Sequence, residues 1–385
     1  MRLVVTGGGT GGHIYPALAV AEWFRDQPGT EAVTYVGRLD GLESRLAPEA
    51  GFAFTGVRVY GMPRPNSVGW PVQMVRWLWT MREAYHDAKA ILSELKPDVV
   101  FGTGGYVSAP VLLAAKSLGM PYAVHEPDAQ PGLSNRFLSR DAQLITTSFE
   151  KGKHRLETGA HKPTQRIVVT GNPIRGSIGG LTREEAKAQL DFAPPPKYRL
   201  TLLVTGGSQG ARKVNQAVAG CLPSLILKHH IAVMHVTGAK LYDETCTQIQ
   251  AASPDLLSHP AYWLRPYTHQ MAALLACADF AVCRAGSLSL SEMYVSGLPT
   301  ILIPYPYAAA NHQFKNAEAS VAAGASLLLP DAACTPETLL AHIEALVQDA
   351  ARFTAMRAAA QSLAHPHATE EIGRLLLKLA ESHTK

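Results

Sequence analysis

One local pattern occurs twice in this chain and limits its fold more than any other feature. Residues 3–8 read LVVTGG, and residues 200–207 read LTLLVTGG. Each copy is an apolar run that enters a glycine turn, and each is followed by a small-residue loop and a segment with helical spacing. A buried strand, a glycine turn and a helix open the βαβ unit of a Rossmann-like domain. The repeat therefore predicts two Rossmann-like α/β domains, and 385 residues are enough for two domains of about 150 residues each.

Further apolar runs alternate with helical stretches in both halves, which predicts parallel sheets covered on both faces. Strands are expected at residues 3–6, 32–36, 98–101, 122–125, 144–147, 200–205, 231–236, 261–264, 280–283, 300–303 and 326–329. Helices are expected at residues 15–25, 42–49 and 370–381. We expect an N-terminal domain over 1–172, a C-terminal domain over 173–365, and a C-terminal helix over 366–385 whose packing the sequence leaves open.

Charge and cysteine content narrow the class of protein. The formal net charge is only +4, and no run of like charges occurs. This mild basicity suits an anionic ligand or an anionic membrane surface, whereas a nucleic-acid-binding protein is expected to carry a clustered basic stripe. The five Cys are scattered without any Cys-x-x-Cys, which favours reduced thiols over a disulfide framework. No apolar run reaches the ~20 residues that span a bilayer, and no secretory segment precedes the first strand, so we expect a cytosolic protein.

The first glycine turn formally matches a dinucleotide fingerprint, with Gly7, Gly9 and Gly12 at the required spacing. A nicotinamide site also needs an acidic residue at the end of the second strand, but that strand ends at Arg38. Two more glycine turns follow at residues 102–105 and 206–210. Glycine turns from both halves favour a ligand held between two domains, although each turn can also be read as a tight strand–helix connection.

The sequence contains none of the usual metal-binding motifs. No Asp-x-Asp occurs, and no Cys or His cluster has zinc spacing. A diphosphate must then be stabilised by helix N-termini, hydroxyl groups and basic side chains. The segment 284–292 fits this role, because a strand there enters a serine-rich helix start; simple N-capping by serine is the alternative.

An ordered set of motifs carries a family resemblance. Together, residues 10–17, 102–108, 171–175, 206–211, 283–292 and 311–317 closely resemble the MurG family of peptidoglycan N-acetylglucosaminyltransferases. The resemblance implies a GT-B fold, in which two Rossmann-like domains with parallel sheets face each other across a cleft. It also implies inverting transfer of GlcNAc from UDP-GlcNAc to the 4-hydroxyl of the polyprenyl-diphosphate-linked muramoyl-pentapeptide, without a cofactor or catalytic metal. We expect no nucleic-acid partner.

The resemblance also implies roles for single residues. We expect His13 to be the general base, since a histidine on the first glycine loop has a suitable ordinary pKa; a capping or positioning histidine is the alternative. Arg175 and Ser208 are expected near the donor diphosphate, Glu292 at the ribose hydroxyls, Gln313 at the sugar hydroxyls and Tyr267 near the base. The full set expected to bind UDP-GlcNAc is Thr10, Gly11, Gly12, Asp128, Arg175, Ser208, Tyr267, Ser287, Leu288, Glu292 and Gln313.

One position departs from the family pattern. The family often reads His-Glu-Gln-Asn where this chain has His125, Glu126, Pro127 and Asp128. An ionised aspartate accepts hydrogen bonds but donates none, so Asp128 can hold a sugar hydroxyl but not a carbonyl oxygen. His125 and Glu126 are equally well explained as buried groups at a strand end.

Three of the five Trp lie within ten residues, at Trp70, Trp77 and Trp79, with Arg64, Arg76 and Arg82 nearby. Tryptophan beside arginine suits a lipid headgroup region. We expect peripheral attachment to the cytoplasmic face of the inner membrane; a core helix with a few exposed tips is the alternative. Two other functions remain open, a UDP-sugar 2-epimerase of the same fold and a non-catalytic UDP-sugar sensor.

Overall fold

The computed structural model describes residues 1–63, 69–158 and 165–383 and divides the chain into two compact units. The first unit comprises Met1–Arg175 and His367–Lys385, and the second comprises Gly176–Pro366. The C-terminal helix, α15 (Ala368–His383), therefore belongs to the first unit, although about 190 residues of the second unit precede it in the chain.

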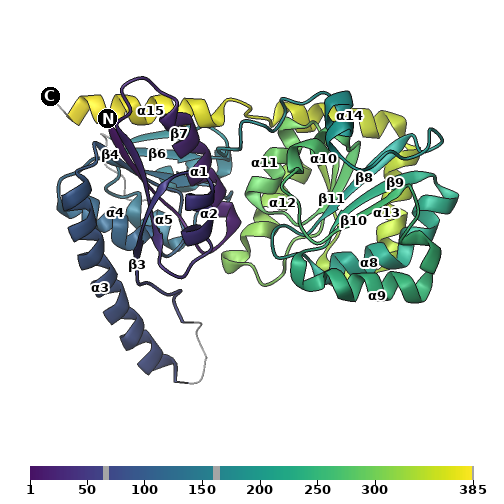
Figure 1. Ribbon diagram of the computed structural model, residues 1–385, viewed down its shortest axis with the longest axis horizontal. Coiled ribbons are helices and arrows are strands. Elements are labelled where there is room, and N and C mark those ends of the chain that lie inside the picture. The colour runs from purple at the N-terminus through teal and green to yellow at the C-terminus, as the bar shows by residue number, and fades with distance from the viewer. Residues whose placement is uncertain (64–68, 159–164, 384–385) are drawn as a thin grey trace. The chain divides into compact units, whose positions relative to one another are not determined.

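The first unit is built on a seven-stranded sheet in the order β3-β2-β1-β4-β5-β6-β7 (Figure 1). Its strands are β1 (Arg2–Thr6), β2 (Ala32–Arg38), β3 (Ala53–Val57), β4 (Val99–Gly102), β5 (Tyr122–Glu126), β6 (Leu144–Thr147) and β7 (Arg166–Val169). Its other helices are α1 (Gly11–Arg25), α2 (Glu43–Glu49), α3 (Trp70–Leu95), α4 (Ser108–Ser117), α5 (Leu133–Leu138) and α6 (Glu150–Glu157).

The second unit has a six-stranded sheet in the order β10-β9-β8-β11-β12-β13. Its strands are β8 (Leu200–Thr205), β9 (Ile231–Val236), β10 (Tyr262–Arg265), β11 (Phe280–Cys283), β12 (Thr300–Leu302) and β13 (Ser326–Leu328). Its α-helices are α7 (Arg183–Gln189), α8 (Arg212–Pro223), α9 (Tyr242–Ala252), α10 (Met271–Cys277), α11 (Ser287–Val295), α12 (His312–Ala322), α13 (Pro336–Gln348) and α14 (Ala350–Ser362). Short single turns are η1 (Ser224–Lys228), η2 (Ala239–Leu241), η3 (Pro254–Leu256), η4 (Ala309–Asn311) and η5 (Asp331–Ala333).

Every strand pair in both sheets is parallel, which confirms the predicted fold class. All predicted strands are present, and β6, β8, β9 and β11 have the predicted bounds. Two strands at or near the sheet margin were not predicted: β3 and β7. Both are only partly buried. In β3 the apolar run is interrupted by Thr55 and Gly56, whereas β7 contains a short apolar run, residues 167–169, that the prediction did not include.

Strand alternation gives the first unit a core on each face of its sheet. On β1, Leu3 and Val5 join the core that also contains residues of α1 and α15, while Val4 joins the core that contains residues of α3 and α4. Because both faces are covered, the ligand-accessible part of the sheet is its carboxyl edge, where each strand passes into a loop.

Candidate functional site

The first two glycine turns pack against each other at the carboxyl edge of the first sheet. They follow the neighbouring strands β1 and β4. The Gly8 amide donates to the Gly104 carbonyl oxygen at 3.4 Å. Gly105 has φ +81°, and a Cβ there would lie 2.2 Å from the Gly8 carbonyl oxygen, so no other residue fits without a shift of the backbone. The two turns thus form one surface at the edge where open α/β sheets bind ligands.

His13 lies on this surface, as the third residue of α1 after Gly11 and Gly12. Its Nδ1 is 2.9 Å from the Thr103 carbonyl oxygen, and the Thr103 hydroxyl donates to the His13 carbonyl oxygen at 2.6 Å. A carbonyl oxygen only accepts, so in the neutral ring Nδ1 carries the proton and Nε2 carries the lone pair. The half-buried ring is therefore fixed in the tautomer that a base acting through Nε2 requires.

The helices α1, α8 and α11 begin at the carboxyl edges without a side-chain cap, as do other helices there such as α4 and α12. Thr10, Ala211 and Gly286 are the N-cap residues of α1, α8 and α11, and none makes a side-chain hydrogen bond to the first turn. By contrast, α7 and α13 begin with capping boxes at Thr182 and Thr335. The serine-capping alternative for α11 is therefore not what the structure shows. The first-turn amides of these three helices suit an anion.

The end of β5 carries a buried polar pair. His125 is fully buried; its Nδ1 lies 2.9 Å from the Thr146 hydroxyl and its Nε2 lies 2.9 Å from the Asn172 side-chain oxygen. Burial lowers the pKa of His125 to about 4, so the ring is neutral at physiological pH. His125 is therefore a structural link between neighbouring elements and does not face solvent.

Glu126 holds the loop that follows β5. Its carboxylate accepts hydrogen bonds from the amide of Asp128 at 2.9 Å, the amide of Gly132 at 3.1 Å and the side chain of Asn135 at 3.0 Å. Burial, with a smaller contribution from Asp128, raises the pKa of Glu126 to about 8. Asp128 is half-buried in this loop, and its charge and that of His13 both act on the pKa of His125. The structure thus gathers Thr10–His13, residues 102–105 and residues 125–128 at one edge.

Arg175 is the last residue of the first unit before the chain enters the second. Its guanidinium carbon lies 4.4 Å from the centre of the Tyr15 ring on α1, a cation–π contact that fixes the positive charge beside the start of that helix.

In the second unit, the third glycine turn follows β8 and carries Ser208, which is exposed. Gly210 has φ +72°, and a Cβ there would lie 2.0 Å from the Thr237 carbonyl oxygen, so this turn also requires glycine. Tyr267 follows β10, is 38% exposed, and packs edge-to-face against His269 at 5.0 Å between ring centres.

The remaining predicted donor residues lie on α11 and α12. Ser287, Leu288 and Glu292 are on α11; Ser287 is 6% exposed and Glu292 is 8% exposed. Gln313 is the second residue of α12, and its side-chain oxygen accepts a hydrogen bond from the Tyr305 amide at 2.9 Å. Both helices begin at the carboxyl edge of the second sheet, after β11 and β12.

Two residues of the carboxyl edges were not singled out from the sequence. Thr103 fixes the His13 ring, and Arg284 joins the loops after β11 and β12. Both lie inside motifs that were recognised, so their position directly after a strand was the available signal. Their partners were not readable, because the contacts join residues 90 and 19 positions apart.

The first half of α3 is exposed. Its buried residues are Ala84, Ala88 and Leu92, all in the second half, which contacts α4. The exposed fractions of Val72, Val75, Leu78 and Trp79 lie between 56% and 74%, and that of Trp70 is 37%. Trp77 is half-buried and donates from Nε1 to the Tyr60 carbonyl oxygen at 3.0 Å. Arg64 lies outside the described residues.

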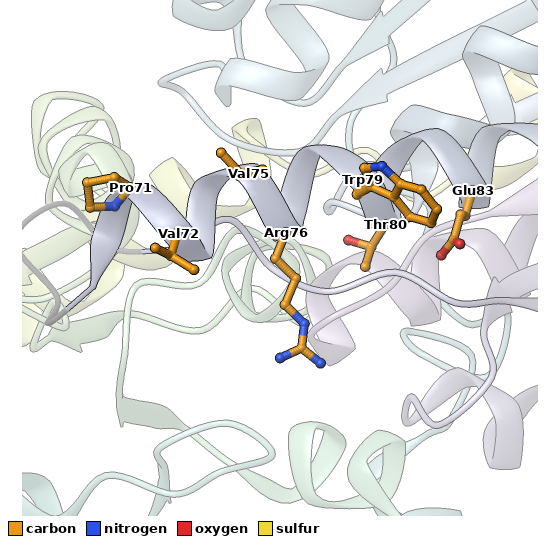
Figure 2. Close-up of a pocket in the computed structure, with 7 residues that line it drawn as sticks. All are labelled: Pro71, Val72, Val75, Arg76, Trp79, Thr80 and Glu83. Carbon is orange, nitrogen blue, oxygen red and sulfur yellow. The ribbon is translucent and has the colours of Figure 1, made fainter.

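Figure 2 shows a hollow along this part of α3, lined by Pro71, Val72, Val75, Arg76, Trp79, Thr80 and Glu83. Arg76 and Arg82 are both exposed on the same helix. This pattern differs from the core helix with a few exposed tips that was the alternative from sequence. Within the described ranges, no helix is both long and apolar enough to cross a membrane. No group of three or more His, Cys, Asp or Glu side chains in those ranges is arranged to hold a metal ion.

The chain is similar to known families and proteins over most of its length. The chain matches the Glycosyltransferase family 28 N-terminal domain over residues 3–147 and the Glycosyltransferase family 28 C-terminal domain over residues 201–372. It is 38% identical over 379 residues to a protein of Desulforamulus reducens, covering 98% of this chain and 99% of that protein. It is 40% identical over 381 residues to a protein of Desulfitobacterium hafniense, covering 99% of this chain and 100% of that protein. Both are named UDP-N-acetylglucosamine--N-acetylmuramyl-(pentapeptide) pyrophosphoryl-undecaprenol N-acetylglucosamine transferase.

Solved structures with the same two-domain fold are also similar to this chain. The crystal structure of Acinetobacter baumannii MurG is similar with a TM-score of 0.70 at 27% identity, covering 98% of this chain and 99% of that one. A UDP-GlcNAc 2-epimerase from Neisseria meningitidis, bound to UDP-GlcNAc, has a TM-score of 0.67 at 14% identity and covers 98% of this chain and all of that one, a likeness of fold alone. The predicted GT-B fold class is confirmed.

Proposed function

The chain belongs to glycosyltransferase family 28, and from this premise we propose that it transfers GlcNAc from UDP-GlcNAc to a lipid-linked acceptor. The acceptor is the 4-hydroxyl of N-acetylmuramoyl-pentapeptide on a polyprenyl diphosphate, and the product is the disaccharide precursor of peptidoglycan. The observation that carries this proposal is identity of 38–40% over nearly the full length to relatives whose names state this reaction.

His13 is the general base of the proposed reaction. An inverting transfer is a single in-line displacement, so the acceptor hydroxyl must lose its proton as it attacks the anomeric carbon. The contact from Nδ1 to the Thr103 carbonyl oxygen holds the ring with Nε2 as the accepting nitrogen. Thr10, Gly11 and Gly12 directly precede His13 at the start of α1. Two glycines there leave the backbone open to the sugars, and a side chain at either position is expected to narrow that space.

The departing UDP gains negative charge, and the second unit offers two places to stabilise it. The helices α8 and α11 begin with uncapped amides at the carboxyl edge, next to Ser208 and to Ser287 and Leu288. Preorganised amides aimed at developing charge are an effective form of catalysis and need no metal ion. Arg175, expected near the donor diphosphate by the family resemblance, carries a positive charge that is held by its contact with Tyr15.

The donor is recognised by groups on the second unit. Glu292 accepts hydrogen bonds from the ribose hydroxyls, a task suited to a largely buried carboxylate. Gln313 meets the hydroxyls of the sugar, and the backbone around Tyr267 meets the base. Asp128 lies on the loop after β5, where its amide donates to Glu126 and its carboxylate can accept a hydrogen bond from a sugar hydroxyl.

The exposed half of α3 attaches the protein to the cytoplasmic face of the membrane that holds the acceptor. Its apolar side chains project from the unit, and its arginines suit anionic headgroups at about 1 kcal/mol each. Because the acceptor carries a polyprenyl tail, peripheral attachment raises the local concentration of the second substrate.

The proposal is tested by following UDP release from UDP-GlcNAc by the purified chain, with and without the lipid-linked acceptor. A transferase releases UDP in proportion to acceptor. A 2-epimerase instead interconverts the sugar's C2 configuration without acceptor, and a sensor binds the donor without turnover. Either of these results would reject the proposal.

A further inference from the structure

The loop that joins β12 to α12, residues 303–311, holds an unusual conformation. Its tyrosines are exposed, Tyr305 to 43% and Tyr307 to 79%. Ala310 and Asn311 both have left-handed backbones, with φ +49° and +55°. The left-handed conformation costs an alanine about 1–2 kcal/mol, whereas asparagine adopts it more readily, so Ala310 keeps it only where surrounding contacts fix the loop. Contacts with neighbouring side chains must therefore hold this loop in place.

Arg284 holds the first residues of this loop, 303–305. It follows β11, the strand next to β12 in the sheet. Its Nη1 lies 2.9 Å from the Ile303 carbonyl oxygen, 3.2 Å from the Pro304 carbonyl oxygen and 2.5 Å from Asp331 Oδ1. Its guanidinium carbon is 5.6 Å from the centre of the Tyr305 ring. The side chain is only 11% exposed, so these charge-assisted contacts are partly shielded from water.

The loop in turn fixes the orientation of Gln313. The Tyr305 amide donates to the atom of the Gln313 side chain that faces it, at 2.9 Å. A backbone amide can only donate, so that atom is the carbonyl oxygen. The NH₂ group is then the part of the Gln313 amide that can meet a ligand. Gln313 is thereby presented as a donor to an oxygen atom, and not as an acceptor.

We propose that Arg284 and Asp331 are positioning residues for the donor sugar. They fix the 303–311 loop so that Tyr305 holds Gln313 with its NH₂ group presented to a sugar hydroxyl or carbonyl oxygen. This inference rests on the proposed function, which assigns the sugar to Gln313. It adds that sugar recognition depends on an ion pair that does not itself touch the sugar.

A second ion pair on the same strand provides a matched control. Asp279 immediately precedes β11, whereas Arg284 immediately follows it. Asp279 accepts hydrogen bonds from Arg183 at 2.8 and 3.0 Å and from the Thr201 amide at 2.8 Å. This pair is also partly buried, but it lies at the amino edge of the sheet, away from the predicted ligand. Its loss should affect stability without affecting sugar recognition.

The experiment measures binding of UDP and of UDP-GlcNAc to the full chain by calorimetry, since UDP lacks the sugar. The variants are Gln313→Glu, Asp331→Asn and Arg284→Lys, with Asp279→Asn as control. Gln313→Glu keeps an oxygen for the Tyr305 amide but removes the donor. We expect each of the first three to weaken UDP-GlcNAc binding about tenfold while UDP binding stays within about twofold. Asp331→Glu, which keeps the carboxylate, should recover much of the loss.

Equal weakening of UDP and UDP-GlcNAc in Asp331→Asn and Arg284→Lys would overturn the inference, because the ion pair would then support the whole nucleotide site. Wild-type affinity for UDP-GlcNAc in Gln313→Glu would also overturn it, and this variant does not depend on the ion pair for folding. A change in the ratio of the UDP-GlcNAc and UDP affinities in Asp279→Asn would also overturn the inference, because the effect would then not be specific to the Arg284–Asp331 ion pair. If the wild-type chain binds neither ligand, the proposed function fails, and the inference fails with it.

Discussion

The exposed half of α3 makes a quantitative prediction about membrane binding. The substitutions Val75→Ser, Leu78→Ser and Trp79→Ser together remove three side chains that are 65%, 56% and 61% exposed. Complete burial of such a side chain is worth about 2 kcal/mol, so burying the exposed part of each is worth about 1.2 kcal/mol. The three together contribute about 3.6 kcal/mol, or a roughly 400-fold change in the vesicle partition coefficient. Trp77 is left intact, because its indole is bound to the Tyr60 carbonyl oxygen.

The assay is co-flotation with vesicles that contain anionic lipid, over a range of lipid concentrations. Leu227→Ser is the matched control, because Leu227 is 58% exposed but belongs to the second unit. The buried residues of α3 begin at Ala84, so the triple variant should keep the wild-type melting temperature. Raising salt should weaken wild-type binding through Arg76 and Arg82. The reasoning is refuted if the folded triple variant binds vesicles within about twofold of wild type, or if wild type does not bind.

Other predictions concern the chemistry and the pH response. His13→Ala should lower kcat about 10²- to 10⁴-fold with little change in donor KM, and near-normal turnover would remove His13 from the base role. Glu292→Ala should raise the donor KM about tenfold or more, since hydrogen bonds to a charged group are lost; an unchanged KM would argue against the ribose contact. Turnover should persist in a chelator, and irreversible loss on metal removal would contradict stabilisation of UDP by helix amides. Burial lowers the pKa of His125 to about 4 and that of His235 to about 3, from an ordinary value of 6.5. Below about pH 6.5 the unfolded chain therefore protonates these two histidines, whereas the folded chain does not, and the free energy of unfolding should fall as pH drops from 6.5 toward 4. Thermal unfolding over this pH range measures the effect, and a flat profile would contradict it.

Much of the fold was predictable because the two sheets are parallel and buried. The strands β6, β9 and β11 are buried at every residue and consist mainly of apolar and β-branched residues between loops, so their bounds were readable directly. The strand β3 was missed because Thr55 and Gly56 interrupt its apolar pattern. The strand β7 offers only a short apolar run, residues 167–169, at an edge of the sheet where burial is partial. Glycine turns were readable for the same local reason, since a close backbone approach leaves no room for a Cβ.

The packing of α15 was not predictable. Its apolar residues, including Ile372 and Leu376, join the same core as α1, and Gly373 makes room for the Trp23 ring. An amphipathic pattern shows that a helix buries one face, but it does not show which surface covers that face. That choice depends on contacts between segments more than 300 residues apart in the chain.

The candidate site was also predictable only in part. Residue types and motif order indicated His13, Glu292 and Gln313, but not the groups that orient them. Thr103 acts on His13 through its backbone carbonyl oxygen, which carries no residue-specific signal in the sequence. The buried state of His125 and Glu126 likewise depends on tertiary contacts with Thr146, Asn172 and Asn135.

Identification of the product tests the central claim most directly. UDP-GlcNAc labelled in the sugar is incubated with the purified chain and the polyprenyl-diphosphate-linked muramoyl-pentapeptide, and the extracted lipid is analysed by mass spectrometry and NMR. We expect one labelled GlcNAc per acceptor, joined to the 4-position of the muramoyl residue in the β configuration. An α linkage would contradict single inverting displacement, and label that remains in the aqueous phase as free or epimerised sugar would contradict the transferase itself.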